Sequence, residues 1–304
     1  MTDVVGIGVS TLDLLHLVDE FPAGEGVQRS KGSALVGGGP VATALVTLSR
    51  LGASTAMVDS LGDDWRSRMI IEEFAREVVA ADCIQMHTGA SASIASVLVR
   101  ISDGARHIIF SPGSAPELTP QELPASIIQN AGMLHLNGRH QQASLRAIEI
   151  ARKAGVLISF DGGAGRYTPE HQLLVAQTSI CIVALDYANA LTQYADPQTA
   201  GLALLAAGPR LVVITNGLEG SWVFTEDDQF HQPAFQMAKV VDTTGCGDSY
   251  HGAFLFGVLK GLQLRSAARL AAAVAAMNTQ ALGGRSALPT FQQAQVFLQQ
   301  HPPQ

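Results

Sequence analysis

The clearest chemical signal in this chain is the segment DTTGCGDSYHGAF, residues 242–254. Gly245 and Gly247 let a ligand approach the backbone closely, and the amides that follow them begin an amphipathic helix. The positive end of a helix dipole binds anions, so these amides form a candidate anion cradle. Asp248 stands beside the cradle. Because a carboxylate repels a phosphate, we expect Asp248 to act as a base that accepts a proton from an attacking hydroxyl group.

An ordinary helix cap is the alternative interpretation of this segment. Aspartate and threonine often cap helices, and a lone Gly-x-Gly-Asp would favour that interpretation. Here the whole segment 242–254 combines a strand end, two threonines, Gly-x-Gly, a second acid and a helix. The complete segment therefore favours a site of phosphoryl transfer.

Short apolar, β-branched runs alternate with helical patterns along the chain. They predict strands at 4–9, 55–61, 133–137, 156–161, 180–185 and 211–217. Helical spacing predicts helices at 40–51 and 142–154, each followed by a glycine that suits a helix end. Continuous apolar strands are covered on both faces, so we expect an α/β fold with a mostly parallel, doubly wound sheet.

One region departs from this alternation. Residues 93–111 form two alternating runs joined by Ser102-Asp103-Gly104, which predicts a β-hairpin. We expect segment 14–36 to supply one or two further strands beside it. The chain, 1–304, is therefore predicted to be one domain carrying a small antiparallel β lid that covers a site.

The composition excludes several classes of protein. The chain has 26 acidic and 19 basic residues, and it lacks the basic stripe of a nucleic-acid binder. Three widely spaced cysteines without CxxC exclude a disulfide framework and a cysteine zinc site. We expect no signal peptide, because the first residues resemble a strand, and no membrane span, because the apolar run 267–281 is too short. A cytoplasmic protein is expected.

Other catalytic motifs are incomplete or missing in the sequence. Gly6 and Gly8 begin a dinucleotide-type pattern, but Thr11 stands at its third glycine. The chain contains no GxxxxGK[ST] and no HExxH, so neither a P-loop nor zinc catalysis is expected. His251 follows Asp248 by three residues. We interpret it as a packing or rim residue, with substrate contact as the alternative.

The segment 242–254 resembles the carboxyl-terminal signature DTxGxGDxFxGAF of the ribokinase-like (PfkB) family of carbohydrate and nucleoside kinases. Four further segments are similar to family sequences: 6–22, 36–52, 215–223 and 282–289. The resemblance thus extends over nearly the whole chain. It implies a ribokinase-like three-layer α/β/α fold and an ATP-dependent sugar kinase that transfers the γ-phosphoryl group.

The resemblance also implies a role for individual residues. Asp248 is the implied catalytic base, and the amides of Gly245, Cys246 and Gly247 the implied anion hole. The residues implied to face the sugar are Asp13, Gly38, Gly39 and Thr43. The residues implied to line the nucleotide site are Thr215, Gly217, Gly220 and Asn278. Asp242 and Thr244 match positions that often hold K⁺ in this family. Mg²⁺ is expected with ATP, because the phosphate oxygens need their charge neutralised.

Two departures from the family pattern stand out. Where the family usually carries an asparagine that binds sugar hydroxyls, this chain has Pro40 and Thr43. The NxxE motif, linked to magnesium and phosphate, is missing, and residues 184–188 read ALDYA. Asp186 is the candidate substitute for that motif.

Local similarity narrows the substrate to a ketose with a reactive primary hydroxyl. Residues 134–144 resemble ketohexokinases, whereas 37–44 and 231–248 resemble bacterial sulfofructose kinases. Arg139 is then a candidate ligand for a sulfonate or phosphate on the sugar. The alternative is a structural arginine that bonds to carbonyl groups at the strand ends.

Two rival functions remain open from the sequence. A nucleoside kinase needs an aromatic platform in the lid, where Phe21 and Phe110 are the candidates. A non-catalytic sensor of nucleotide or sugar has no use for the base Asp248. The expected partners are a small sugar, ATP and a second copy of the chain bound through the lid, because an apolar sheet face rarely stays uncovered.

Overall fold

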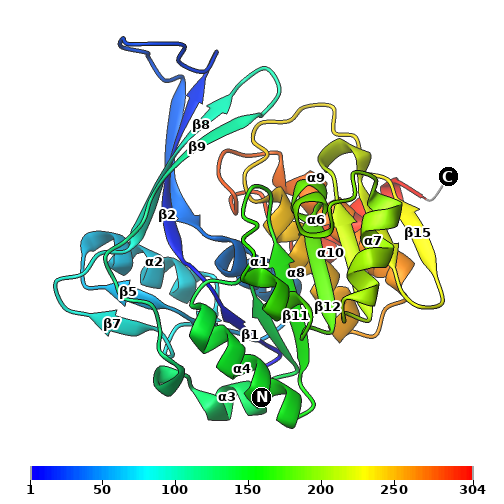
Figure 1. Ribbon diagram of the computed structural model, residues 1–304. Coiled ribbons are helices and arrows are strands. Elements are labelled where there is room, and N and C mark those ends of the chain that lie inside the picture. Colours follow the sequence, from blue (N-terminus) through cyan, green and yellow to red (C-terminus); the bar gives the residue numbers. More distant parts are fainter. Residues whose placement is uncertain (1, 303–304) are drawn as a thin grey trace.

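The computed structural model describes residues 2–302 (Figure 1). Within that range the main sheet has nine strands in the order β15-β14-β13-β12-β11-β10-β1-β4-β6. In this spatial order, the strands from β13 to β6 at the end of the sheet run parallel to one another. Strands β14 and β15 complete the sheet at the other end as antiparallel strands. Their bounds are β1 Val4–Ile7, β4 Thr55–Val58, β6 Val79–Ala80, β10 Met133–Leu136, β11 Leu157–Gly162, β12 Ile180–Ala184, β13 Leu211–Thr215, β14 Ser221–Phe224 and β15 Gln229–Gln232.

Helices cover both faces of this sheet. One face carries α1 Pro40–Leu51, α2 Trp65–Arg76, α8 Cys246–Leu259, α9 Leu264–Asn278 and α10 Phe291–Gln300. The other carries α3 Ala125–Gln129, α4 Gln141–Lys153, α5 His171–Val175, α6 Leu185–Thr192 and α7 Pro197–Ala206. Successive strand residues alternate between the two cores, as Val4 and Val5 do. The predicted three-layer α/β/α fold is confirmed.

A second sheet projects from this body (Figure 1). It contains β2 Thr11–Val18, β3 Gly32–Gly38, β8 Ser93–Arg100 and β9 Arg106–Ser111, in the order β3-β2-β8-β9. The predicted hairpin is β8–β9, and Gly104 takes a left-handed conformation in its turn, with φ of 68°. The outer pairs are antiparallel, but β2 and β8 run parallel. A parallel pair is possible because a long stretch of chain separates them.

Short and peripheral elements were not predicted from the sequence. Strands β5 Ser60–Gly62 and β7 Gln85–His87 form a small parallel pair, and two 3₁₀ turns occur at Pro120–Glu122 and Gly217–Glu219. Among the described residues, no helix has both the length and the apolar character that crossing a membrane requires.

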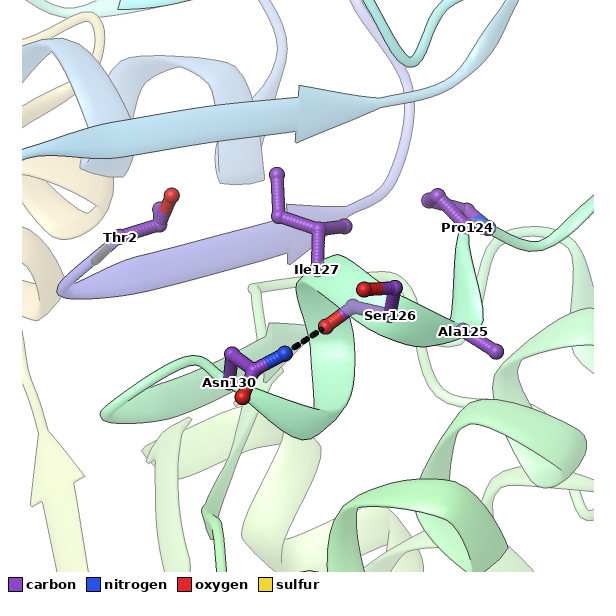
Figure 2. Close-up of a pocket in the computed structure, with 6 residues that line it drawn as sticks. All are labelled: Thr2, Pro124, Ala125, Ser126, Ile127 and Asn130. Atoms are coloured by element: carbon purple, nitrogen blue, oxygen red, sulfur yellow. Dashed lines mark hydrogen bonds between the residues drawn. The ribbon is translucent and has the colours of Figure 1, made fainter.

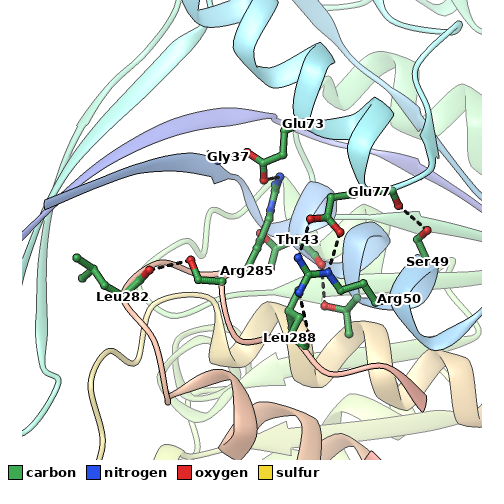
Figure 3. A network of polar contacts seen from close by, with 11 residues as sticks. Gly37, Thr43, Ser49, Arg50, Glu73, Glu77, Leu282, Arg285 and Leu288 are labelled. Carbon is green, nitrogen blue, oxygen red and sulfur yellow. Dashed lines mark hydrogen bonds and ion pairs between the residues drawn. The ribbon is translucent and has the colours of Figure 1, made fainter. Parts of the chain in front are cut away.

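A buried arginine anchors the segment before α10 to β3, α1 and α2 (Figure 3). Arg285 is 3% exposed. Its guanidinium donates to Thr43 Oγ1 at 3.0 Å and to the carbonyl of Gly38 at 2.6 Å, and pairs with Glu73 Oε1 at 3.0 Å. One side chain thus joins the last loop, β3, α1 and α2, so that these elements hold one arrangement.

We expect Arg285→Met to lower the free energy of unfolding by about 3–5 kcal/mol, because it leaves the carboxylate of Glu73 without its partner. Urea unfolding measures the change. The control is Arg265→Met, whose pair with Asp228 is exposed (61% and 50%) and should cost less than about 1 kcal/mol. Equal losses in the two variants would contradict the anchoring role of Arg285.

Candidate active site

A cleft of about 1360 Å³ lies between the main sheet and the smaller sheet. Its floor comes from residues at the carboxyl ends of neighbouring parallel strands: Asn137 after β10, Asp161 in β11, Asp186 after β12 and Asn216 after β13. Ligands of open parallel sheets bind at this edge. The topology therefore collects polar side chains from distant parts of the sequence in one place.

The roof of the cleft comes from alternate residues of the smaller sheet. They are Thr11 and Asp13 from β2, Ser93 and Ala95 from β8, and Arg106, Ile108 and Phe110 from β9. Alternation is the geometry of a strand, in which every second side chain points to the same face. One face of the smaller sheet, which carries both polar and apolar side chains, therefore lines the cleft.

The predicted anion cradle lies at the start of α8. Gly245 precedes the helix with φ of 71°, and a Cβ there would lie 2.6 Å from the carbonyl oxygen of Gly284. The amide of Cys246 makes a long contact of 3.4 Å with the carbonyl of Thr243. The next amides of the first turn have no intrahelical carbonyl to bond. Burial raises the pKa of the Cys246 thiol to about 12, so this side chain stays neutral. Gly245, Cys246, Gly247 and Asp248 all line the cleft.

Asp248 sits beside a guanidinium group. Arg166 Nη2 lies 3.6 Å from Asp248 Oδ1, and the Asp248 side chain is 20% exposed. Burial raises the pKa of Asp248, the Arg166 charge opposes that rise, and the nearby carboxylate of Asp161 adds to it. A carboxyl group with a raised pKa holds a proton more firmly than an ordinary aspartate. Such a group is suited to accept a proton from a hydroxyl.

Two arginines of the cleft were missed by the sequence analysis. Arg106 Nη1 donates to Thr243 Oγ1 at 3.0 Å, which joins the lid to the loop before α8. Arg166 approaches Asp248 from the loop after β11. The alternation of residues 106, 108 and 110 was a readable signal for Arg106, but no motif marked Arg166. Together they add positive charge around the cradle.

Asp13 and Gly38 are in direct contact. Thr11 Oγ1 donates to Asp13 Oδ1 at 2.8 Å, and Asp13 is 8% exposed. A Cβ at Gly38 would lie 2.1 Å from Asp13 Oδ2. Gly38 is not part of the cleft lining. Its lack of a side chain leaves space for the Asp13 carboxylate. Burial raises the pKa of Asp13 to about 6.

Other predicted site residues also line the cleft. These are Gly39, Thr215, Gly217, Gly220, Arg139 and Thr244. Gly220 has φ of 90°, and a Cβ there would lie 2.2 Å from the carbonyl oxygen of Gln232. Arg139 Nη1 pairs with Glu117 Oε1 at 2.9 Å. The guanidinium thus meets a carboxylate of the same cleft, which is neither of the two partners considered from the sequence.

Besides Gly38, three predicted residues do not reach the cleft. Thr43 is buried and its hydroxyl accepts from Arg285 Nε. Asn278 Nδ2 donates to the carbonyl of Gly284 at 2.8 Å. Asp242 accepts from the amides of Thr244 and Gly283, each at 2.8 Å. In this geometry they shape the loops around the cleft rather than contact a ligand in it.

A second, smaller hollow lies beside α3 (Figure 2). It measures about 540 Å³ and is lined by Thr2, Pro124, Ala125, Ser126, Ile127 and Asn130. None of these lining side chains is charged, and Asn130 Nδ2 is already used by the carbonyl of Ser126 at 2.8 Å. The groups able to do chemistry are in the large cleft.

An anion cradle, a buried carboxylate and two arginines in one cleft define the site of a phosphotransferase that acts on a hydroxyl group. Residues 1–291 match the sequence profile of the pfkB family of carbohydrate kinases. The chain is 30% identical over 314 residues to probable fructokinase-4 of Arabidopsis thaliana, covering 93% of this chain and 94% of that one. It is 27% identical over 288 residues to a nucleoside kinase of Methanothermobacter thermautotrophicus, covering 94% and 92%.

A solved structure shares the fold. Ribokinase of Arabidopsis thaliana, in complex with ribose and ATP, matches with a TM-score of 0.84 at 24% identity, covering 98% of this chain and 99% of that one. The chain belongs to the pfkB family of carbohydrate kinases. It is an ATP-dependent sugar kinase, which confirms the activity class and the ribokinase-like fold predicted from the sequence.

We expect Asp13→Asn to stabilise the ligand-free protein at pH 8. The folded state keeps the Asp13 proton up to about pH 6, whereas the unfolded chain loses it near the ordinary aspartate pKa of 3.8. Folding therefore becomes more favourable as the pH falls through this window, and the ionised carboxylate costs about 3 kcal/mol above it. The variant should gain up to that amount at pH 8 and lose the advantage by pH 4.

Urea unfolding at the two pH values measures this difference. Asp19→Asn is the control, because the Asp19 side chain is 68% exposed and its removal should change little. A variant at Asp13 that is less stable at pH 8 than the unchanged protein would show that Thr11 and Arg285 outweigh the cost of burial.

Proposed function

We propose that this sugar kinase phosphorylates a primary hydroxyl of a ketose of the fructose type. The observation that carries the proposal is that the carboxylates of Asp248 and Asp13 line the same cleft, one at the anion cradle and one on the lid. The similarity to a fructokinase over nearly the whole chain supports a ketose.

The proposed reaction uses the residues in three roles. Asp13 accepts hydrogen bonds from sugar hydroxyls and orients the ring. The attacking hydroxyl gives its proton to Asp248, its oxygen bonds to the γ-phosphorus, and the bond to the ADP oxygen breaks. The amides of residues 245–247, with Arg106 and Arg166, stabilise the charge on the transferred group. The lid excludes water, which would otherwise accept the phosphoryl group.

Mg²⁺ is proposed to accompany ATP and to neutralise its phosphate oxygens. Asp186 lies in the sequence where the NxxE motif would fall, and it lines the cleft. Its carboxylate oxygens accept hydrogen bonds from the amides of Gly165 and Tyr187. We also propose that a potassium ion binds beside Asp242 and Thr244. The buried hydroxyl of Thr244 makes no hydrogen bond within residues 2–302, which fits a missing cation partner.

The charges near Arg139 favour a neutral sugar over one that carries a sulfonate or phosphate. Glu117 already pairs with the Arg139 guanidinium at 2.9 Å, and Glu170 also lines the cleft. An anionic sugar would have to displace Glu117 to reach Arg139, in a cleft that holds this further carboxylate.

A nucleoside is the second candidate substrate, because a nucleoside kinase is among the relatives. Phe110 lines the cleft and is 52% exposed, so it can stack on a base. Phe21, the other aromatic residue considered, stacks near Arg100 and His107 instead.

The proposal is tested by measuring ADP release with ATP, Mg²⁺ and K⁺ across fructose, tagatose, ribose, 6-sulfofructose, fructose 6-phosphate and adenosine. We expect fructose or tagatose to give the highest kcat/KM, because the site is acidic and Arg139 is paired. Preference for a sulfonated or phosphorylated sugar would contradict the neutral-sugar assignment, and preference for adenosine would favour the nucleoside.

Asp248→Asn is the catalytic control in the same assay. We expect it to bind ATP and sugar normally and to lose at least about a hundredfold in kcat, because no other group in the proposal accepts the proton. Near-normal turnover would remove Asp248 from the role of base.

We also propose that the protein is cytoplasmic and forms a homodimer through the lid. Free Cys83, Cys181 and Cys246 fit a reducing compartment. For the dimer, β9 is an edge strand of the lid, and Ile108, Ile109 and Phe110 on it are about half exposed. An open edge with apolar side chains is normally covered.

Light scattering at micromolar concentration should therefore give about twice the chain mass of 31.9 kDa. Ile109→Lys should shift the protein to one chain mass, because Ile109 is 55% exposed and is not part of the cleft lining. Val296→Lys on α10, also at an exposed apolar residue, is the control and should stay dimeric. A monomeric unchanged protein would refute the dimer.

A further inference from the structure

Beneath the cleft, three side chains from distant parts of the chain meet in the protein interior. His135 comes from β10, Asp161 from β11 and His251 from α8. Their exposed fractions are 0%, 2% and 3%. One nitrogen or oxygen from each lies within 4.8 Å of the corresponding atoms of the other two. Two imidazoles and one carboxylate therefore face one another away from bulk solvent.

The facing atoms of this cluster are short of hydrogen-bond partners. Among the described residues, His135 Nε2, His251 Nδ1 and both carboxylate oxygens of Asp161 make no hydrogen bond of ordinary geometry. The amide of Gly163 is near enough to favour the charged form of Asp161. His251 Nδ1 lies 3.6 Å from Asp161 Oδ2, which is too long for a hydrogen bond. Buried polar atoms are normally hydrogen-bonded or bound to an ion, so several unpartnered atoms at one place indicate one shared partner.

The separation of His251 and Asp161 fits a shared cation. Two ligands bound at about 2.0–2.1 Å to a tetrahedral ion lie roughly 3.3–3.4 Å apart, close to the 3.6 Å between His251 Nδ1 and Asp161 Oδ2. His135 Nδ1 lies 3.2 Å from Ser159 Oγ. When that nitrogen donates to the hydroxyl, Nε2 presents its lone pair to the cluster, which is the usual outer support of a metal-binding histidine.

Burial favours the neutral form of the two imidazoles, which is the form that binds a metal. It lowers the pKa of both His135 and His251 to about 4, so both imidazoles are neutral at physiological pH. Burial raises the pKa of Asp161, so keeping its carboxylate ionised inside the protein costs free energy. A divalent ion offsets that cost by direct bonding to the carboxylate.

We propose that His135, Asp161 and His251 form a binding site for a divalent transition-metal ion such as Zn²⁺. Imidazole donors favour zinc, iron, nickel or copper over Mg²⁺, which prefers oxygen ligands. The site is therefore distinct from any ion that accompanies ATP. Asp161 and His251 also line the cleft, which gives the ion a route of entry and leaves space for a water ligand.

The position of this site links it to the catalytic helix. His251 lies one turn after Asp248 on α8, and residues three apart share a helix face. An ion held by His251, Asp161 and His135 ties the second turn of α8 to two neighbouring strands of the sheet. We infer that the ion positions the helix that carries the cradle and the base, without itself contacting the substrates.

The test uses the full chain without ATP or sugar, after dialysis against a chelator. Titration with Co²⁺ should give visible d–d absorption typical of nitrogen and oxygen ligands, saturating at one ion per chain. Competition with Zn²⁺ should bleach that absorption, and Zn²⁺ should raise Tm. His251→Ala and Asp161→Asn should each weaken uptake by at least about a hundredfold.

His231→Ala is the matched control, because His231 lies on β15 and takes no part in the cluster. It should take up Co²⁺ like the unchanged protein. The proposal is overturned if the unchanged protein shows no absorption band, or if uptake is the same in His251→Ala. Because the first of these outcomes uses no variant, a folding failure in a variant leaves the proposal testable.

Discussion

The close approach of two backbone segments, at Gly245 and Gly284, is the contact on which the rest of the site depends. A side chain at Gly245 would collide with the carbonyl of Gly284, so α8 can begin there only with glycine. Asp242 accepts the amide of Gly283, and Arg285 anchors the same loop to α1 and α2. The cradle amides and Asp248 thus take their positions from a loop that is itself held by a buried charge pair.

The cleft concentrates buried carboxylates at a cost in stability. Burial raises the pKa values of Asp13, Asp161 and Asp248. Arg166 offsets part of that cost beside Asp248. A protein selected for stability alone would replace these acids with neutral residues, whereas the roles proposed above, a base and a group that orients a sugar, need carboxylates. The electrostatic strain of the cleft is therefore a signature of its chemistry.

The two faces of the lid differ, because successive side chains along a strand point to opposite faces. The face with Asp13, Arg106 and Phe110 closes over the cleft, and the opposite face carries Ile109. Arg106 and the turn at Gly104 reach the loop before α8 through Thr243. The position of the lid and that of the loop before α8 are thus coupled by direct hydrogen bonds.

The sequence by itself determined six of the nine strands of the main sheet, the hairpin β8–β9 and the glycine-rich start of the helix that carries Asp248, because each depends on neighbours within one turn or one strand. Strands β6, β14 and β15 were not predicted. Tertiary structure alone decided which distant residues meet. Arg166 reaches Asp248, and Arg285 takes Thr43 away from the cleft, through contacts that no local pattern encodes. The cluster of His135, Asp161 and His251 likewise exists only because strand order places β10 beside β11 and packs α8 against them. Local patterns carry backbone geometry, whereas the meeting of side chains depends on sheet order and packing.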